Sequence, residues 1–371
     1  MKFSVSSLDL QKTLVKAGSV IPTKSTMPIL ENYLFKLKDD NLEITATDME
    51  MSILTSIKVA GEANGSMVVP AKRLMDTIRA LPNVNLKFSA DINSNKIIMQ
   101  TDKGEYRLTG QPASEYPEIP HLKDAEEISI ETDLFKRFIN KTVFAASTDE
   151  LRPAMTGVLF QLKKGQIRAV ATDGHRLVKI TNTSFDSLKR ERDVIIPTKS
   201  LNVISKHFEE PIKSVSIDET NVLFNFGETI MISRVIDEKY PNYESVIPSD
   251  NNLTLLVNKS ELLSSVKRTS LYASTTTHQV RFSINKNVLS ISAEDIDFGS
   301  EAKETIACEF TDDTLEIGFN ANYVVDMLSH LEDEEIEFLL STPSRAVMIK
   351  PKNQSEKEEL LMLVMPVRLS S

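Results

Sequence analysis

Apolar positions along the chain follow two alternating periods. Six segments repeat apolar residues every three to four positions, which predicts amphipathic helices. The stretches between them alternate apolar and polar residues, which predicts strands. Short polar turns such as LKDDN, LKKGQ and INKNV separate successive strands, so we expect antiparallel meanders. The predicted helices span residues 8–18, 71–80, 133–145, 198–207, 258–270 and 320–331.

This order of elements occurs three times. The segments 5–53, 130–178 and 256–299 align as a helix, a strand, a polar turn and a second strand that ends in TD, TD and AE. The acids at these ends are Asp48, Asp173 and Glu294, which lie 125 and 121 residues apart. Each segment is followed by a second strand that runs into a helix. A repeat of about 120 residues is the size of one domain.

The repeat predicts an α+β fold of three similar domains in tandem. Each domain contains two units of a strand, a helix and three strands, with the helices on one face of the sheets. The phrases EYPEIP and KYPNYESVIP close the first two repeats, and their prolines mark linkers. The predicted domains are therefore residues 1–122, 123–250 and 251–371.

Composition excludes several classes of site. The single cysteine, Cys308, allows no internal disulfide, and the five histidines form no metal-binding motif, so we expect no metal and no cofactor. Neither a phosphate-binding glycine loop nor a run of about 18 apolar residues occurs. The N-terminus lacks the pattern of a secretory signal, so the sequence predicts a cytoplasmic protein that makes no use of a membrane.

Charge is distributed unevenly along the chain. The formal net charge is −10, but the six predicted helices together carry +8, so the remaining residues carry −18. Solvated helix faces often carry lysine, but five basic helices in an acidic chain favour a positive surface for sequence-independent contact with a DNA backbone. The candidate side chains on the helices are Lys12, Lys16, Lys72, Arg73, Arg79, Arg137, Lys141, Lys199, Lys206 and Lys267.

Three motifs carry a resemblance that covers essentially the whole chain. Together with the three tandem domains, ATDGHRL, KYPNYESVIP and the terminal LVMPVRL resemble the bacterial sliding clamp, the beta subunit of DNA polymerase III. The resemblance implies a homodimeric, head-to-tail ring with helices inside and sheets outside, which encircles duplex DNA. It also implies a processivity factor with no catalytic site of its own. The implied partners, bound through short peptide motifs, are the replicative polymerase, the clamp-loader ATPase, repair polymerases and mismatch-repair proteins.

The resemblance also assigns roles to residues. Lys24 matches a basic loop residue that contacts DNA, whereas Pro153 and Ala154 replace the family's aromatic pair, which argues against stacking on DNA there. The implied subunit interface contains Tyr106, Leu108, Leu271 and Tyr272. The implied peptide-binding pocket contains Met155, Thr172, Gly174, His175, Arg176, Leu177, Pro241, Val246, Leu363, Val364, Met365, Pro366 and Arg368.

Comparison of the repeats divides ATDGHRL into two parts. The acid Asp173 is shared, so we interpret it as a turn or cap residue, whereas Gly174 to Leu177 occur only in the second repeat. His175 and Arg176 are expected at the polar rim of the pocket, and Leu363 to Leu369 are expected to form an exposed apolar tail. Two alternatives remain: an enzyme with Asp173, His175 and a serine as a triad, and a repeat scaffold that binds proteins but not DNA.

Overall fold

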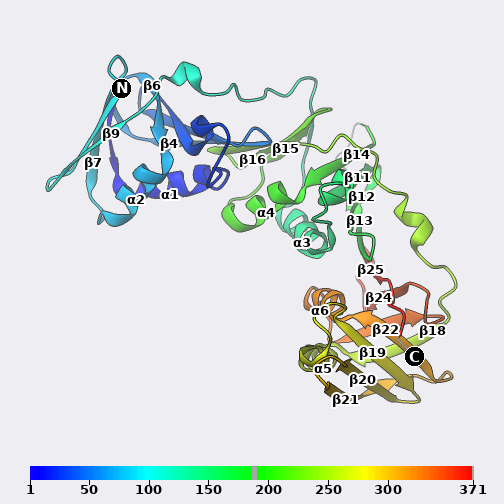
Figure 1. Cartoon of the computed structure of the whole chain (residues 1–371). Coiled ribbons are helices and arrows are strands. Elements are labelled where there is room, and N and C mark those ends of the chain that lie inside the picture. Colours follow the sequence, from blue (N-terminus) through cyan, green and yellow to red (C-terminus); the bar gives the residue numbers. More distant parts are fainter. Residues whose placement is uncertain (186–189, 370–371) are drawn as a thin grey trace. The chain divides into compact units, whose positions relative to one another are not determined.

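The computed structural model describes residues 1–185 and 190–369. It confirms the α+β class, the six helices and the threefold repeat of strand and helix units (Figure 1). One difference is a short additional strand, β5 (Ala60–Ala63), in the first repeat. The other elements of the first repeat are β1 (Lys2–Ser6), α1 (Ser7–Gly18), β2 (Asn32–Lys38), β3 (Asn41–Thr47), β4 (Met51–Lys58), β6 (Gly65–Pro70), α2 (Ala71–Ala80), β7 (Asn85–Asp91), β8 (Lys96–Gln100) and β9 (Glu105–Thr109).

The second and third repeats follow the same order. The second contains β10 (Glu126–Ile128), α3 (Thr132–Thr142), β11 (Gly157–Lys163), β12 (Gly165–Thr172), β13 (Arg176–Phe185), β14 (Arg192–Pro197), α4 (Thr198–His207), β15 (Ser214–Ile217), β16 (Asn221–Asn225) and β17 (Thr229–Arg234). The third contains β18 (Leu253–Asn258), α5 (Lys259–Thr269), β19 (Gln279–Asn285), β20 (Val288–Asp295), β21 (Ser300–Glu309), β22 (Leu315–Asn320), α6 (Ala321–Ser329), β23 (Glu335–Leu340), β24 (Val347–Pro351) and β25 (Glu358–Val364).

The chain divides into two compact units, which cut the second repeat between its two halves. Unit 1 comprises Met1–Leu134 and Lys199–Val235, and unit 2 comprises Phe135–Thr198 and Ile236–Ser371. In unit 1 the pairing of β17 with β4 builds an eight-stranded sheet, and β5, β1, β7, β8 and β9 form a five-stranded one. In unit 2 the pairing of β13 with β25 builds a twelve-stranded sheet. The domain boundaries near residues 122 and 250 stay a prediction.

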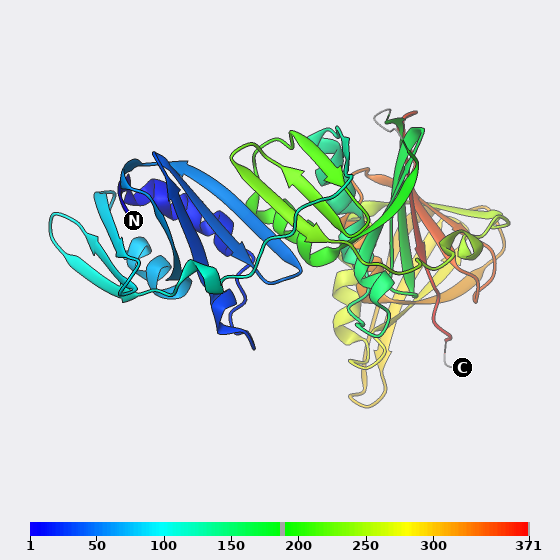
Figure 2. The ribbon, with the colours of Figure 1, turned by 90° about the horizontal axis from the view of Figure 1, so that it is seen from above.

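The helices bury most of the apolar residues that their sequence patterns predict, although Val15 of α1 is exposed. In α1 the side chains of Leu10, Leu14 and Ala17 are fully buried, and the hydroxyl of Ser6 accepts a hydrogen bond from Asp9 N at the start of the helix. Figure 2 shows α1, in dark blue, lying along the strands of its unit. In the third repeat α5 and α6 lie side by side on one face of the sheet (Figure 1). The opposite faces of these helices are left for other contacts.

Candidate functional site

The ATDGHRL stretch forms a tight turn between β12 and β13. Asp173 Oδ1 accepts hydrogen bonds from the backbone N–H groups of His175 (2.9 Å) and Arg176 (3.0 Å). The hydroxyl of Thr172 donates to Arg176 O at 2.6 Å and accepts from Gly174 N at 3.1 Å. Gly174 has φ = 91°, a left-handed conformation that favours glycine. The shared acid therefore has the structural role that the repeat comparison assigned to it.

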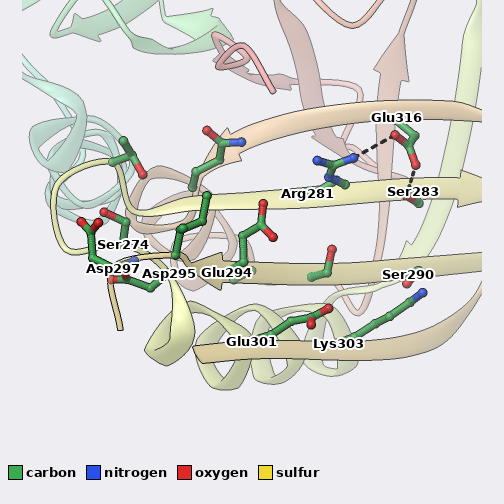
Figure 3. A pocket seen from close by; sticks show the side chains of 15 residues that line it. Ser274, Arg281, Ser283, Ser290, Glu294, Asp295, Asp297, Glu301, Lys303 and Glu316 are labelled. Atoms are coloured by element: carbon green, nitrogen blue, oxygen red, sulfur yellow. Dashed lines mark hydrogen bonds and ion pairs between the residues drawn. The ribbon is translucent and has the colours of Figure 1, made fainter. Parts of the chain in front are cut away.

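The same turn occurs in the first repeat, where Asp48 Oδ1 accepts from Glu50 N and Met51 N. In the third repeat the acid that makes this turn is Asp295, whose Oδ1 accepts from the N–H groups two and three residues further on. The alignment of Glu294 with Asp48 and Asp173 was therefore wrong by one residue. Asp295 is buried and Glu294 is exposed, because consecutive residues of β20 point to opposite faces of the sheet (Figure 3).

Alternation along β13 also separates Leu177 from Arg176. Leu177 packs in a buried apolar cluster with Leu363 and five other residues: Leu159, Val170, Ile195, Tyr243 and Ala346. Leu177 and Leu363 lie opposite each other in the pairing of β13 with β25. Ala154, Ile236, Tyr240 and Ile247 are only partly buried and pack against this cluster. The structure thus brings the predicted pocket residues Leu177 and Leu363 together in an apolar cluster that reaches the surface.

Arg176 points to the other side of β13. Its Nε donates to Asp173 Oδ2 at 3.1 Å, its Nη2 donates to Phe144 O at 2.7 Å, and its Nη1 lies 2.5 Å from Asp326 Oδ2. The guanidinium lies over the ring of Tyr323, 4.7 Å from the centroid. These contacts bury Arg176, so its expected position at the rim of a pocket is wrong. His175 is exposed, as a rim residue would be, and its ring stacks on Tyr323 with 6.0 Å between centroids.

The C-terminal segment is partly in the core. Leu363 and Val364 are buried in β25, so the exposed apolar tail begins at Met365 and not at Leu363. Met365 N donates to His175 O at 2.8 Å, and Val367 N donates to Gly318 O at 2.9 Å. Pro366, which has no N–H, lies between these two donors, just beyond the end of the strand. The tail is therefore held by its backbone beside the turn at residues 173–176.

The remaining predicted pocket residues fall into buried and exposed groups. Met155 and Thr172 are buried. A Cβ atom on Gly174 would lie 3.7 Å from Met155 Cε, so Gly174 and Met155 are neighbours. Val246, Met365, Pro241 and Arg368 are exposed.

The aromatic residues Tyr240, Tyr243 and Tyr323 were not predicted for this site. Tyr240 and Tyr243 lie in the YPNY phrase that we interpreted as a linker. Burial raises the pKa of the Tyr323 hydroxyl, and the charge of Asp173 adds to this shift.

Comparison with known proteins identifies the family. Models for the N-terminal, central and C-terminal domains of the DNA polymerase III beta subunit match residues 1–120, 129–242 and 244–368. The beta sliding clamp of Chlamydia muridarum is 30% identical to this chain, over 100% of the chain and 99% of the relative.

The chain belongs to the beta sliding clamp family. The crystal structure of the Bacillus subtilis clamp superimposes on it with a TM-score of 0.94 at 30% identity, with 100% of both chains covered. A clamp of Pseudomonas aeruginosa bound to griselimycin gives a TM-score of 0.92 at 25% identity, again with 100% of both chains covered. A beta clamp is a non-catalytic processivity subunit of the polymerase. The triad hypothesis is thereby excluded, and Asp173 is already engaged by Arg176 and two backbone N–H groups.

The basic residues that the sequence assigned to DNA differ in their surroundings in this clamp. Seven are exposed, and among the described residues no acidic side chain pairs with them: Lys12, Lys24, Lys72, Arg73, Arg79, Lys206 and Lys267. Lys16 pairs with Glu210, and Lys199 pairs with Asp48. Arg137 binds Glu332 and Glu358.

Lys141 is the clearest difference from the predicted basic face. It is only 5% exposed, donates to His330 O at 2.6 Å and pairs with Glu332 at 2.8 Å. The expectation that it lies on an exposed face was therefore wrong.

The third repeat also exposes apolar residues at one end. Leu271 and Tyr272 are 81% and 45% exposed, and Ile296 and Phe298, at the tip of the hairpin between β20 and β21, are 83% and 82% exposed. A polar cavity of about 570 Å³ lies on the exposed face of β19 to β22, and Glu301 and Lys303 of β21 are among the residues that line it (Figure 3).

In the part of the chain that is described, no helix has the length and apolarity needed to cross a membrane.

Proposed function

We propose that two copies of this chain close head to tail into a ring that encircles duplex DNA without sequence preference and tethers the replicative polymerase. The observation that carries this proposal is the segregation of charge: the helices are basic, whereas the chain as a whole is acidic. A ring is linked to DNA by topology, so weak and uniform attraction to phosphates is sufficient and still allows sliding. Because the family is bacterial, we propose that the protein acts in the cytoplasm.

The exposed cations on the helices support contact with DNA. Lys12 of α1, Lys72 and Arg79 of α2, Lys206 of α4 and Lys267 of α5 all reach solvent. We propose that these side chains contact phosphates, which carry no sequence information, so binding would not depend on sequence. The paired residues Lys16, Arg137 and Lys199 contribute less, because each already has an acidic neighbour.

Two open sheet edges support ring closure. Among the described strands β9 pairs only with β8, and β21 pairs with β18 only at Glu309 and Cys308, so most of one edge of β21 is open. An open edge is a template for strand pairing with another chain. Tyr106 and Leu108 lie on the inner face of β9, opposite Met99 and Ile97 of β8, and we propose that they meet Leu271 and Tyr272 of a second copy.

The exposed charges on these edges favour one register. Glu105 and Arg107 point outward from β9, and Glu301 and Lys303 point outward from β21. Antiparallel pairing that sets Arg107 opposite Glu301 also sets Glu105 opposite Lys303. Both cross-strand pairs are then of opposite charge, which stabilises a sheet, whereas like charges directly opposite each other destabilise it.

The apolar cluster around Leu177 supports a peptide-binding pocket. It combines buried Leu177 and Leu363 with partly buried Tyr240 and Ile247, and exposed His175 supplies a polar group two residues before Leu177. Such a mixture suits a surface that accepts short peptides from several proteins. The proposed partners are the replicative polymerase, the clamp loader, repair polymerases and mismatch-repair proteins. We also propose that griselimycin, which binds the P. aeruginosa clamp, binds this chain at the same cluster.

Retention on circular DNA tests the topological proposal. The protein is loaded on nicked circular DNA by a clamp loader, and the complex is isolated by gel filtration before and after the circle is cut. Rapid loss after linearisation is expected for a ring; equal retention on both forms would contradict it.

Replacement of Leu271 and Tyr272 by lysine should give monomers in sedimentation, and an unchanged dimer mass would exclude the proposed interface.

A further inference from the structure

Helix α6 is the exception to the basic helices, because its only charged residue is Asp326. This carboxylate contacts Arg176 of β13, in the same compact unit, with 2.5 Å between Oδ2 and Nη1. The one charged residue of α6, Asp326, therefore pairs with Arg176 of the ATDGHRL turn. This turn forms one side of the proposed pocket.

The guanidinium of Arg176 is held from three directions. Asp173, Asp326 and the carbonyl oxygen of Phe144 accept its hydrogen bonds, and the rings of Tyr323 and Phe144 lie 4.7 and 5.5 Å from it. Tyr323 also stacks on His175. Since the backbone of Arg176 continues directly into Leu177, these contacts hold the turn in one position relative to α6.

The first repeat contains the same turn without this ion pair. Arg176 and Met51 each lie three residues after the turn acid and each begin a strand, β13 and β4. Asp326 and Val203 each occupy the sixth position of the second helix of the next repeat, α6 and α4. Met51 and Val203 are both buried, and Asp48 Oδ1 accepts the same two backbone hydrogen bonds as Asp173 Oδ1. The second oxygen of Asp48 pairs with Lys199 of α4. The turn can therefore form with apolar residues at these two positions, so the ion pair between Arg176 and Asp326 is not needed to form it.

We propose that Asp326 is a positioning residue for the peptide pocket. By fixing Arg176 it sets the position of the turn, and the turn sets three parts of the pocket: the Leu177 side chain, the His175 ring and His175 O, to which Met365 of the tail is bonded. Among the described residues the Asp326 carboxylate bonds Arg176 and no residue of the apolar cluster, so it acts through Arg176. This inference rests on the proposed pocket.

The experiment measures griselimycin binding by isothermal titration calorimetry on the full-length protein. Asp326→Asn removes the charge that holds Nη1 but leaves Asp173 and Phe144 O to bond Arg176, so the unfolding midpoint should change little. We expect the dissociation constant to rise about three- to thirtyfold, the range of coupling found for residues that act at a distance. The matched control is Asp76→Asn, at the sixth position of α2, which should leave binding unchanged. Asp326→Glu, which keeps a carboxylate, should bind more tightly than Asp326→Asn.

A second variant separates positioning from folding. Arg176→Met combined with Asp326→Val copies Met51 of β4 and Val203 of α4, so it should fold with wild-type stability and still bind weakly. Hydrogen exchange of the His175 and Arg176 amides, both bonded to Asp173, should be faster in Asp326→Asn than in the wild type. If the wild type binds griselimycin and Asp326→Asn binds it with equal affinity, this inference alone is wrong. No binding by the wild type would overturn the pocket proposal as well, since Asp326 would then have no pocket to position.

Discussion

Lys141 tests whether its burial in the structure or its place in the helical sequence pattern decides what this lysine does. The helical pattern places Lys141 with the basic residues, whereas the structure buries its ammonium group between His330 O and Glu332. Replacement by methionine keeps most of the apolar stem and removes only the charged end. We therefore expect Lys141→Met to reduce the stability of the protein without changing its interaction with DNA.

The contacts set the size of the effect. A hydrogen bond from a charged donor contributes about 1.5 to 3 kcal/mol, and the one to His330 O is lost. The ion pair with Glu332 adds less than about 1 kcal/mol, because the Glu332 side chain is 65% exposed and keeps its bonds to Arg137. Burying an uncharged group in place of an ammonium offsets part of the loss. The expected decrease in the free energy of unfolding is about 2 kcal/mol.

The assay compares Lys141→Met with Lys72→Met, a variant of an exposed lysine on α2. Urea unfolding followed by circular dichroism gives the stability, and DNA binding as a function of salt gives the number of phosphate contacts. Lys72→Met should keep the wild-type stability and reduce the slope of log K against log salt by about 0.9 for each phosphate contact that is lost. A Lys141→Met protein with unchanged stability and a reduced salt slope would refute the reasoning.

Three further perturbations follow from the structure. Hydrogen bonds from Arg137 and Lys141 lower the pKa of Glu332 to about 2, so the stability that this carboxylate adds is present above pH 4.5 and is lost towards pH 2. At pH 6 the free energy of unfolding of the wild type should exceed that of Glu332→Gln by about 1 kcal/mol, after allowance for solvent screening, and this difference should disappear in acid. Gly174→Ala should lower the free energy of unfolding in urea by about 1 kcal/mol, because φ is 91° at this position. The variant should still fold, since Met49 adopts a φ of 78° in the turn of the first repeat. A stabilised variant would contradict the assigned turn. Glu105→Lys should weaken self-association in sedimentation, and adding Lys303→Glu should restore it; failure of the second change to rescue the first would exclude the proposed register.

The repeat explains how much of the site could be read from the sequence. Turn chemistry is local, so comparison of three repeats identified Asp173 as structural and Gly174 to Leu177 as special. The same comparison misaligned Glu294, because AED offers two neighbouring acids and only burial of Asp295 shows which one makes the turn. Tyr323 and Asp326 were missed as neighbours of this turn because they lie about 150 residues away along the chain.

By itself the sequence determined the six helices, the meanders, the threefold repeat and the resemblance to sliding clamps, because these depend on periodicity and motifs within short segments. Only the tertiary structure decided which strands join the repeats, β17 with β4 and β13 with β25, and which charges are neutralised inside the protein. Lys12 and Lys141 look alike in a helical pattern. Their difference arises from acids and carbonyl groups that distant parts of the chain bring to one lysine and not to the other.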